Sequence, residues 1–588
     1  DIVNSPMFKE KLAQYEEVLD LSSRAPPDMH QVHVRAMQAA AAETRDAQLQ
    51  GMAWSKRCTA LTFRQVARAV ARQHVSMAER LLVRHTWLEE LMTVDVMKGV
   101  VMLKDHAEFL RRFVLAQRRV ARARLLASPA EVHEALANHW GEVFCPPARA
   151  ACLAAEGDAS ERCRRERDSK AFIAKYGMKE VDWSSLAPPS AMAIEGALRR
   201  ARPAAPGVDG LPARAWLSHS AGCEVLLAAQ RWMALGRPMR KELNMSIAIF
   251  PPKKVLDGDG MEVIRKPNET RPLMLRSTGP KAIASAVNFK LKSMIDRGAS
   301  KAQRGFITGR DFLEDLVELD AMPRVASMCA LEQARGWEEP TLLSFDFAHA
   351  FPSLLHDWMW WVLEAWTAPL GLEHLLKESY ANVEVVEAGP CHWVLFVILC
   401  GILQGDPLSG TMFAIGAQPF VEARMKQLEA KALGLTRWCA DDIQALIFCR
   451  RGLRSLARIF RLAERLAGLQ LQPKKCAAAP RWAPFSAEVE DAMRKCLDEA
   501  CGWGSFTVAS SVELLGCSVG PGASLAAQWA APLARLRERV LALAASPLDM
   551  TAAFFEHGRR CQPVPAYKAQ LWPMPTELID DERCAGSR

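Results

Sequence analysis

The sequence predicts an α+β fold preceded by an all-helical N-terminal region, and two stretches of the chain carry this prediction. From Ala201 to Gly520 short apolar runs alternate with helical segments and Gly/Pro turns, a pattern typical of a mixed fold. From Asp28 to Ser128 there is no proline, only Gly51 and Gly99 as glycines, and a composition rich in Ala, Leu, Arg, Glu and Gln that favours helix. With 588 residues the chain is too long for one core, so we expect several domains.

Changes in composition divide the chain into four parts. We expect a helical extension over residues 1–145 and a linker over 146–195, where prolines and clustered arginines replace the helical periodicity. The mixed region follows over 196–520. A last helical region with a proline-spaced tail occupies 521–588.

Composition narrows the class of protein. A net charge of +8 permits a polyanionic partner without requiring one. The 16 cysteines are scattered without a CxxC pair, which favours a reduced, intracellular compartment. The longest strongly apolar run, 393–403, is too short to cross a bilayer and is better interpreted as a buried strand, so we expect no membrane partner. The sequence opens at Asp1 with no signal peptide and no initiator Met, as a fragment or a piece of a polyprotein would.

An arginine-rich segment over 111–124 lies on a helical frame inside the N-terminal extension. Its six arginines are Arg111, Arg112, Arg118, Arg119, Arg122 and Arg124. Such a face could bind the phosphates of an RNA. A solvated helix surface explains the same pattern equally well.

Two segments of the mixed region place single polar groups at the ends of apolar runs. In 342–351 an apolar strand ends at Asp346, where an isolated carboxylate would ordinarily cap a helix. In 401–410 a Gly/Pro-rich turn contains Gln404 and Gly405, and glycine there would let backbone approach a ligand closely. An ordinary strand-to-helix loop is the alternative for the second segment.

A third segment, 438–448, is more specific. Asp441 and Asp442 lie between two apolar runs. Adjacent carboxylates in a partly buried site repel by roughly 4 kcal/mol at an effective dielectric of 20, so one is protonated or a cation neutralises them. The pair Asp580 and Asp581 lies in a polar tail and needs neither explanation.

The order of these three segments resembles the palm of reverse transcriptases, and the flanking segments resemble those of the non-LTR retrotransposon branch. The similar segments are 205–210 (APGVDG), 249–254 (IFPPKK), Arg271–Leu273 with Lys281, 303–306 (QRGF), 468–475 (GLQLQPKK), Leu515–Gly516 and 567–572 (YKAQLW). The resemblance covers roughly residues 200–573. Any one segment is weak, but together in the family's order they are specific.

The resemblance implies a right-hand polymerase. Residues 196–520 would form fingers and palm with an antiparallel palm sheet, and 521–588 a partial helical thumb and tail. The implied activity is RNA-directed DNA polymerisation from dNTPs on a DNA primer and an RNA template, carried out in the nucleus by an active element.

The resemblance also implies a metal site. Asp346, Asp441 and Asp442, with the Phe347 carbonyl, would hold two Mg²⁺ ions, for which Mn²⁺ could substitute. Joining a 3′-hydroxyl to an α-phosphate needs one ion to favour the alkoxide and one to neutralise pyrophosphate.

Further roles follow from the same motifs. Phe351 would form the steric gate that excludes a 2′-hydroxyl, although a core phenylalanine is the alternative. Gln404 and Gly405 would line the nucleotide pocket and Arg271 would bind the triphosphate. Lys475, rather than Lys474, would protonate pyrophosphate. The candidates for phosphate binding are Lys253, Lys254, Lys281, Arg304 and Arg310, and each could instead be surface charge.

Some positions depart from the family pattern. Cys439 replaces the aromatic residue two positions before the first Asp of the doublet, Cys400 replaces a basic residue, and Gln472 replaces an asparagine. None removes a proposed metal ligand. We find no segment resembling an endonuclease, an RNase H or a zinc knuckle. Two alternatives therefore remain: a catalytically inactive palm that serves as an RNA-binding scaffold, and a polymerase of the intron-maturase type.

Overall fold

The computed structural model describes most of the chain: residues 5–19, 25–50, 129–146, 159–177, 181–202, 205–218, 220–254, 265–332, 340–388, 393–481, 484–546 and 549–576. The described chain forms two compact units. The first contains 1–167, 180–294 and 351–412, and the second contains 168–179, 295–350 and 413–588. Each unit is described by itself.

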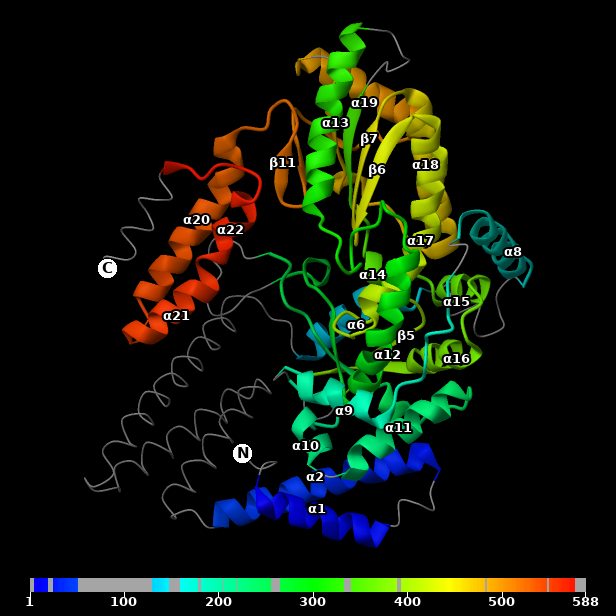
Figure 1. The fold of residues 1–588 in the computed structure, drawn as a ribbon, viewed down its shortest axis with the longest axis vertical. Helices are drawn as coiled ribbons and strands as arrows, with labels where there is room; N and C mark the ends of the chain where they lie inside the picture. The colour runs from blue at the N-terminus through cyan, green and yellow to red at the C-terminus, as the bar shows by residue number, and fades with distance from the viewer. Residues whose placement is uncertain are drawn as a thin grey trace. The chain divides into compact units, whose positions relative to one another are not determined.

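Helices account for the described part of the N-terminal region, which belongs to the first unit apart from the end of α8. They are α1 (Pro6–Leu19), α2 (Pro26–Gln50), α6 (Pro129–Phe144), α8 (Ala159–Tyr176), α9 (Ala191–Arg200), α10 (Ala213–Leu217) and α11 (Ser220–Ala234) (Figure 1). Helix α2 packs against α11, and its His30 ring stacks on Trp216 of α10 at 5.5 Å. The segment expected to be a linker contains α8, while the arginine-rich segment 111–124 lies outside the described residues.

The sheet of the first unit has the strand order β2-β1-β4-β5. Its strands are β1 (Ser246–Ile249), β2 (Leu273–Arg276), β4 (Val383–Glu387) and β5 (Val394–Ile398), antiparallel except for the parallel β1–β4 pair. Helix α6 packs on β5, where the rings of Phe144 and Phe396 stack at 5.4 Å. The remaining helices are α15 (His356–Ala365) and α16 (Leu370–Ser379), together with the first parts of α12 (Thr278–Gly298) and α17 (Ser409–Gln427). Strand β5 confirms the predicted strand within 393–403.

The second unit is built on a five-stranded sheet of order β6-β7-β3-β8-β9. The strands are β3 (Thr341–Phe345), β6 (Gly434–Cys439), β7 (Asp442–Ile447), β8 (Ala477–Pro480) and β9 (Thr507–Val508), and only β8–β9 is parallel. Helices α18 (Arg450–Ala467) and α19 (Ala487–Cys501) pack together, and Phe460 of α18 packs on Phe345 of the central strand at 4.6 Å. Helix α13 (Leu313–Glu332) precedes β3 in the sequence, and the short α14 (Ala350–Ser353) follows it and belongs to the first unit from residue 351 on. Short 3₁₀ turns lie at Lys241–Leu243 and Pro267–Glu269 in the first unit, and at Glu429–Lys431 and Pro473–Lys475 in the second.

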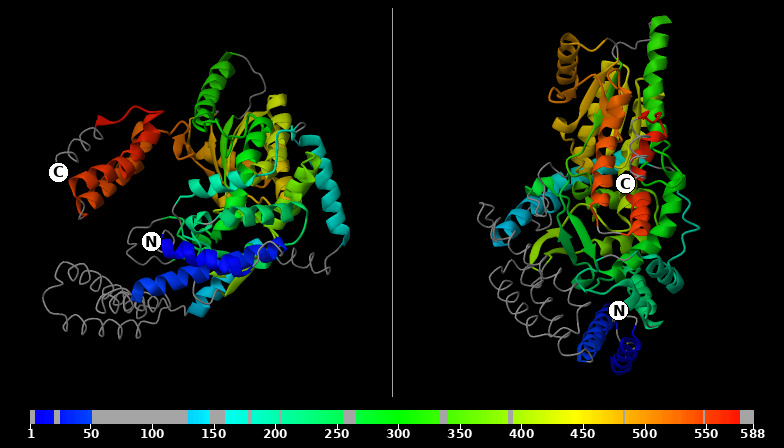
Figure 2. Two further views of the ribbon diagram at one scale, coloured as in Figure 1. Left: turned by 60° about the horizontal axis from the view of Figure 1, so that its bottom comes forward. Right: turned by 90° about the vertical axis from the view of Figure 1, so that its left-hand side faces the viewer.

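The C-terminal part of the second unit is a hairpin followed by three helices. Strands β10 (Val512–Leu514) and β11 (Cys517–Val519) pair antiparallel, and α20 (Leu525–Ala544), α21 (Met550–Arg560) and α22 (Pro563–Ala569) pack on one another (Figure 2). Tyr567 of α22 donates a hydrogen bond to the Leu515 carbonyl at 2.7 Å, and Lys568 donates one to the Gly516 carbonyl. The two motifs that flank this region in the sequence therefore meet in the fold.

The described elements make a mixed fold of helices with mainly antiparallel sheets, which confirms the predicted α+β class. Among the described helices, none has the length and apolar character needed to span a bilayer.

Candidate active site

The carboxylates predicted at the site lie at neighbouring strand ends of the second unit. Strand β3 ends at Phe345, which pairs with Ile443 of β7, so Asp346 follows β3 beside the position where Asp442 begins β7. Antiparallel neighbours at this register lie about 5 Å apart between Cα atoms. The order of the motifs in the sequence predicts that these acids lie together, and the pairing of β3 with β7 brings Asp346 and Asp442 together.

The β6–β7 hairpin that bears the acid pair is held from two sides. Its turn is Ala440–Asp441, with Ala440 in the left-handed region at φ 57°, as a tight two-residue turn requires. The indole N–H of Trp438 donates to the Ala440 carbonyl. A Cβ added at Gly305 would lie 2.0 Å from the Ala440 nitrogen, so only glycine allows the 303–306 segment to approach the hairpin this closely.

The carboxylates influence one another electrostatically. Partial burial, and after it the neighbouring carboxylates of Asp441, Asp346 and Glu513, raise the pKa of Asp442 to about 6. Each of these acids disfavours a second negative charge nearby. Glu513 lies on β10 and was not predicted from the sequence, although it stands two residues before the Leu515–Gly516 turn that was.

Lys475 is the basic residue beside Asp346. Its ammonium lies 3.5 Å from Asp346 Oδ2, and both side chains are about half exposed. The backbone orders this contact, because the Asp346 carbonyl accepts a hydrogen bond from Gln472 at 2.9 Å and the strand-following Phe347 bridges to Leu471. The thiol of Cys476 lies under Asp346, and burial raises its pKa to about 11, so it remains protonated.

The donor set suits a hard divalent cation in its chemistry. Carboxylate oxygens are the ligands that Mg²⁺ prefers, and a cation would relieve the repulsion that, after burial, raises the pKa of Asp442. Within the described ranges, however, no group of three or more His, Cys, Asp or Glu side chains is gathered closely enough to hold an ion as it stands. The carboxylates therefore converge at one end of the sheet without forming a closed cage.

The turn predicted to line a nucleotide pocket lies in the first unit. Its backbone is tied to β2, since Met274 donates to the Gln404 carbonyl at 2.8 Å. Gly405 adopts φ 106° and is exposed, a conformation that side chains with a Cβ rarely adopt. The next residue, Asp406, is buried and pairs with buried Arg276 at 2.6 Å, so this acid of the motif is structural.

The other candidate residues of the first unit differ in how exposed their side chains are. Phe351 is half-buried, and its carbonyl accepts a hydrogen bond from Ile402 at 2.8 Å; the side chain of Arg271 is exposed. Lys281 is half-buried, and burial lowers its pKa. Lys253 donates to the Asn268 carbonyl at 2.8 Å, whereas Lys254 is exposed.

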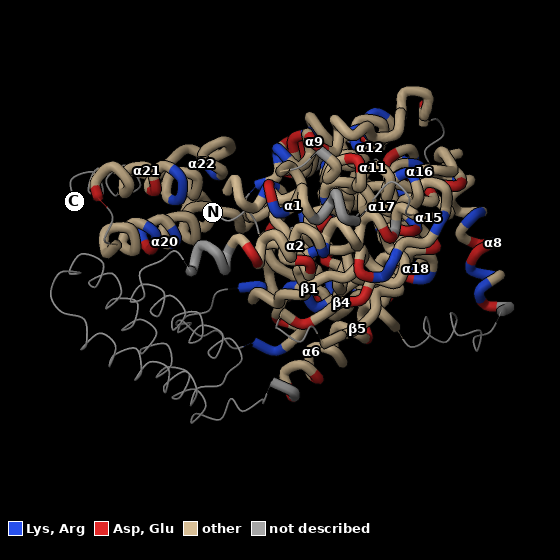
Figure 3. The backbone as a smooth tube through the Cα atoms, turned by 90° about the horizontal axis from the view of Figure 1, so that it is seen from below, with Lys and Arg blue, Asp and Glu red and all other residues tan. Residues whose placement is uncertain are grey.

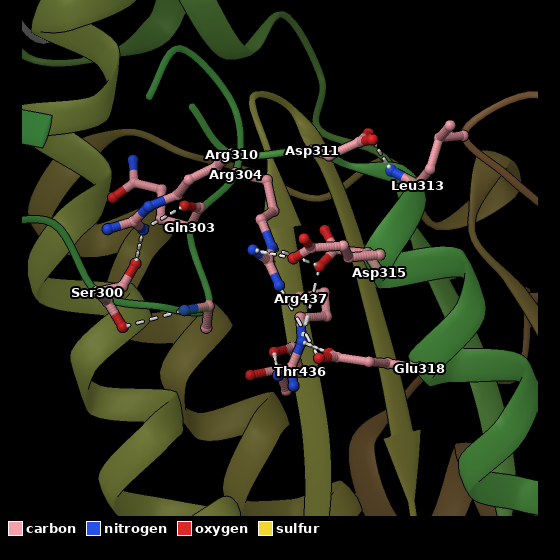
Figure 4. A network of polar contacts seen from close by, with 12 residues as sticks. Ser300, Gln303, Arg304, Arg310, Asp311, Leu313, Asp315, Glu318, Thr436 and Arg437 are labelled. Carbon is pink, nitrogen blue, oxygen red and sulfur yellow. Dashed lines mark hydrogen bonds and ion pairs between the residues drawn. The ribbon is translucent and has the colours of Figure 1, made fainter. Parts of the chain in front are cut away.

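Arg304 and Arg310 of the second unit are engaged by the protein itself (Figure 4). Arg304 pairs with buried Asp315 at 3.0 Å and with Glu314 at 2.7 Å, and Arg437 of β6 joins the same acidic group. Arg310 donates to carbonyls of the segment that follows α12, including those of Ala299 and Gln303. These contacts hold the 303–306 segment against β6 and occupy both guanidinium groups.

Comparison with known proteins agrees with this arrangement. Residues 263–519 match the family model described as "Reverse transcriptase (RNA-dependent DNA polymerase)". A 166-residue stretch is 27% identical to the "Transposon TX1 uncharacterized 149 kDa protein" of Xenopus laevis and covers 28% of this chain and 12% of that protein. A 348-residue stretch is 21% identical to the "Retrovirus-related Pol polyprotein from type-2 retrotransposable element R2DM" of Drosophila melanogaster and covers 58% of this chain and 29% of that protein. The chain thus aligns with less than a third of either relative.

Proposed function

We propose that this chain, which belongs to the reverse transcriptases of the non-LTR retrotransposon type, is an active RNA-directed DNA polymerase that extends a DNA primer on an RNA template with dNTPs. The observation that carries this proposal is the convergence of Asp346 with Asp442 and its neighbour Asp441 at one end of the central strands. A scaffold without catalysis would not need three acids that repel one another at a strand end. For an active element, the proposed site of action is the nucleus.

Two Mg²⁺ ions would be held by Asp346 and Asp441, with Asp442 beside them and the Phe347 carbonyl as a further oxygen ligand; Mn²⁺ could substitute. When bound, the ions would favour the primer alkoxide and neutralise the charge of the departing pyrophosphate. The protein's part is to hold the oxygen ligands in place, which the Trp438 and Gly305 contacts with the hairpin do.

The remaining candidates would bind and orient the nucleotide. Lys475 stands 3.5 Å from Asp346 and would protonate the leaving pyrophosphate. Arg271 would bind the triphosphate, and Gln404 with Gly405 would line the pocket, where the missing side chain of Gly405 leaves backbone accessible. Lys253, Lys254 and Lys281 would hold nucleic-acid phosphates. Arg304 and Arg310 would act indirectly, by fixing the loop that supports β6.

We further propose the right-hand arrangement of a polymerase. Residues 196–520 would supply fingers and palm, with the five-stranded sheet of the second unit as the palm sheet. Helices α20, α21 and α22 would form a partial thumb, and Tyr567 supports this by bonding the Leu515 turn that would grip the primer.

Primer extension tests the function. Purified protein should extend a DNA primer on an RNA template with Mg²⁺ and dNTPs, and Asp441→Ala should abolish extension because a metal ligand is lost. Asp491→Ala, which removes an exposed acid of α19, is the matched control and should retain full activity. Extension that survives Asp441→Ala would refute this site, and an inactive wild type would favour the scaffold.

Sugar selection tests Phe351. Replacing its ring with a methyl group in Phe351→Ala should remove the steric barrier to a 2′-hydroxyl. The measurement is the ratio of kcat/KM for dNTP and rNTP on one template, so that any loss of folded protein cancels. We expect this ratio to fall by about tenfold or more, since a steric clash in a pocket is worth 1–3 kcal/mol. An unchanged ratio would leave Phe351 as a core residue.

A further inference from the structure

Helix α18 presents an exposed row of arginines. Its sequence is strongly amphipathic: Leu453, Leu456, Ile459, Phe460, Ala463 and Leu466 are among its buried residues. The exposed residues include Arg450, Arg451, Arg454, Arg458, Arg461 and Arg465. The spacing of three and four residues places these arginines on one face. The row extends over roughly 22 Å at 1.5 Å per residue.

This arginine row lies on the opposite side of the sheet from the carboxylates. Phe345 points toward α18, where it meets Phe460 at 4.6 Å. Side chains alternate along a strand, so Ser344 points the other way, and its hydroxyl indeed donates to the Glu513 carbonyl of β10. Ser344 pairs with Gln444 of β7, and Asp442 stands two residues from Gln444, so Asp442 belongs to that second side. The arginine row cannot contact a nucleic acid through the catalytic face.

Among the described residues, acidic neighbours form ion pairs only with the ends of the row. Arg450 lies 3.8 Å from Glu499 and Arg465 lies 2.9 Å from Asp168, while Glu464 is the exposed acid of the helix itself. The four arginines between these ends, Arg451, Arg454, Arg458 and Arg461, keep the local charge positive. Arginine binds phosphate through a planar fork of donors, which suits a phosphate backbone better than a point charge does.

A cavity of about 400 Å³ adjoins the row within the second unit. The residues that bear on recognition are Arg458, Arg465 and Lys175 as cations, Ser455 and Gln427 as neutral hydrogen-bonding groups, and Tyr176 as an aromatic ring. Asp168 also lines the cavity and is paired with Arg465. Neutral hydrogen-bond donors and acceptors among these cations can bind the 2′-hydroxyl of a ribose beside its phosphate. DNA lacks this hydroxyl.

From this combination we propose that the arginine face of α18, with the adjoining cavity, binds the backbone of folded RNA at a site separate from the catalytic face. The choice of RNA rests on the proposed function, because the RNA that this chain copies would be the polyanion nearest to it. The site would hold one part of an RNA while another part is copied.

The test measures RNA binding while the catalytic face is occupied. A fluorescein-labelled RNA hairpin of random sequence is titrated against the full chain in the presence of a saturating RNA–DNA primer–template duplex, and anisotropy is followed at several salt concentrations. The variant is Arg451→Gln/Arg454→Gln/Arg458→Gln. Its control is Arg199→Gln/Arg200→Gln/Arg202→Gln, which removes three exposed arginines at the end of α9 and after it.

We expect the α18 variant to bind the hairpin about tenfold or more weakly, and the slope of log affinity against log salt to fall by about 2, since each phosphate contact contributes roughly 0.7 to 0.9. The control variant should bind as the wild type does. Extension of a pre-annealed primer should be unchanged in both variants. Because hairpin binding needs no catalysis, an inactive wild type would refute the proposed function without affecting this readout.

Three results would overturn the proposal: hairpin affinity in the α18 variant equal to that of the wild type, an equal loss in the control variant, or a DNA hairpin of the same sequence bound as tightly as the RNA. The substituted side chains are exposed, so the variants should unfold at the same temperature as the wild type. Equal melting temperatures would exclude misfolding as the cause of a lost affinity.

Discussion

At the scale of single residues, Arg424 is the most unusual group of the second unit. Its guanidinium lies between two aromatic rings, 4.4 Å from the centroid of Trp438 and 4.3 Å from that of Phe460. The side chain is fully buried, and in the described part of the chain none of its three nitrogens has a hydrogen-bond partner. Burial lowers its pKa to about 9. Two cation–π contacts, each worth about 2 kcal/mol when desolvated, offset a desolvation cost of several kcal/mol.

Because attraction and desolvation are of similar size, the volume of Arg424 should matter more than its charge. Arg424→Ala empties the space between the rings and should lower the free energy of unfolding by about 3 kcal/mol. Arg424→Met fills the space without a charge and should stay within about 1 kcal/mol of the wild type. Denaturant unfolding measures both. A Met variant as unstable as the Ala variant would show that the charge itself holds the two rings.

Arg424 also illustrates what the sequence leaves open at this scale. An arginine in the last turn of a helix is ordinarily interpreted as a surface residue that complements the helix dipole. Its burial follows from the packing of α17 against Trp438 of β6 and Phe460 of α18, contacts between residues distant in the chain. The same is true of Arg304, whose ion pairs with acidic residues of α13 join residues of different elements.

At the scale of elements, the strands that carry the site residues could be predicted from the sequence, but the elements that pack beside them could not. An apolar run that ends in an acid, and an acid pair between two apolar runs, are local patterns, so β3 and the β6–β7 hairpin could be predicted from them. The contribution of Glu513 depends on β10 lying beside β3, which no local pattern encodes. The sequence predicts a linker in the first part of 146–195, because arginines and acids obscure the helical periodicity there. The structure has α8 in this segment, and the mixed charge of α8 is visible in Figure 3.

The packing of helix α2 on α10 should make the stability of the first unit depend on pH. His30 of α2 is buried against Trp216, and burial, with a smaller contribution from His33, lowers its pKa to about 4. A histidine whose pKa is lowered by folding makes its full contribution to stability above its pKa in the unfolded chain, which is about 6.5. This contribution is lost as the pH falls toward 4. The unfolded chain takes up the proton first.

The expected loss is about 3 kcal/mol between pH 7 and pH 4, from 1.36 kcal/mol per pKa unit. Urea unfolding followed by tryptophan fluorescence measures it. His30→Gln should be less stable than the wild type at pH 7 but should show a smaller decline on acidification. A decline as steep in the variant as in the wild type would assign the pH dependence to other groups.

At the scale of the whole molecule, the two compact units are interleaved in sequence rather than consecutive. The chain passes between them five times, and three of these crossings, at 167–168, 294–295 and 412–413, run within the long helices α8, α12 and α17. A helix forms cooperatively along its length, because a break in its interior leaves four N–H groups and four C=O groups without hydrogen bonds. Unfolding one unit therefore removes helical structure from the other, and we expect the two to unfold together.

Hydrogen exchange can test this coupling with a substitution confined to one unit. Asp406→Ala leaves Arg276 charged and unpaired in the first unit, which should cost about 3–5 kcal/mol. If the units unfold together, the slowest amides of β3 and β7 in the second unit should exchange about a hundredfold faster or more, as those of β1 and β2 do, since slow amides exchange through global opening. Arg424→Ala, made in the second unit, should accelerate β1 in turn. Acceleration restricted to the substituted unit in both variants would show that α8, α12 and α17 can fray at the boundary, and that the chain consists of two independently stable bodies.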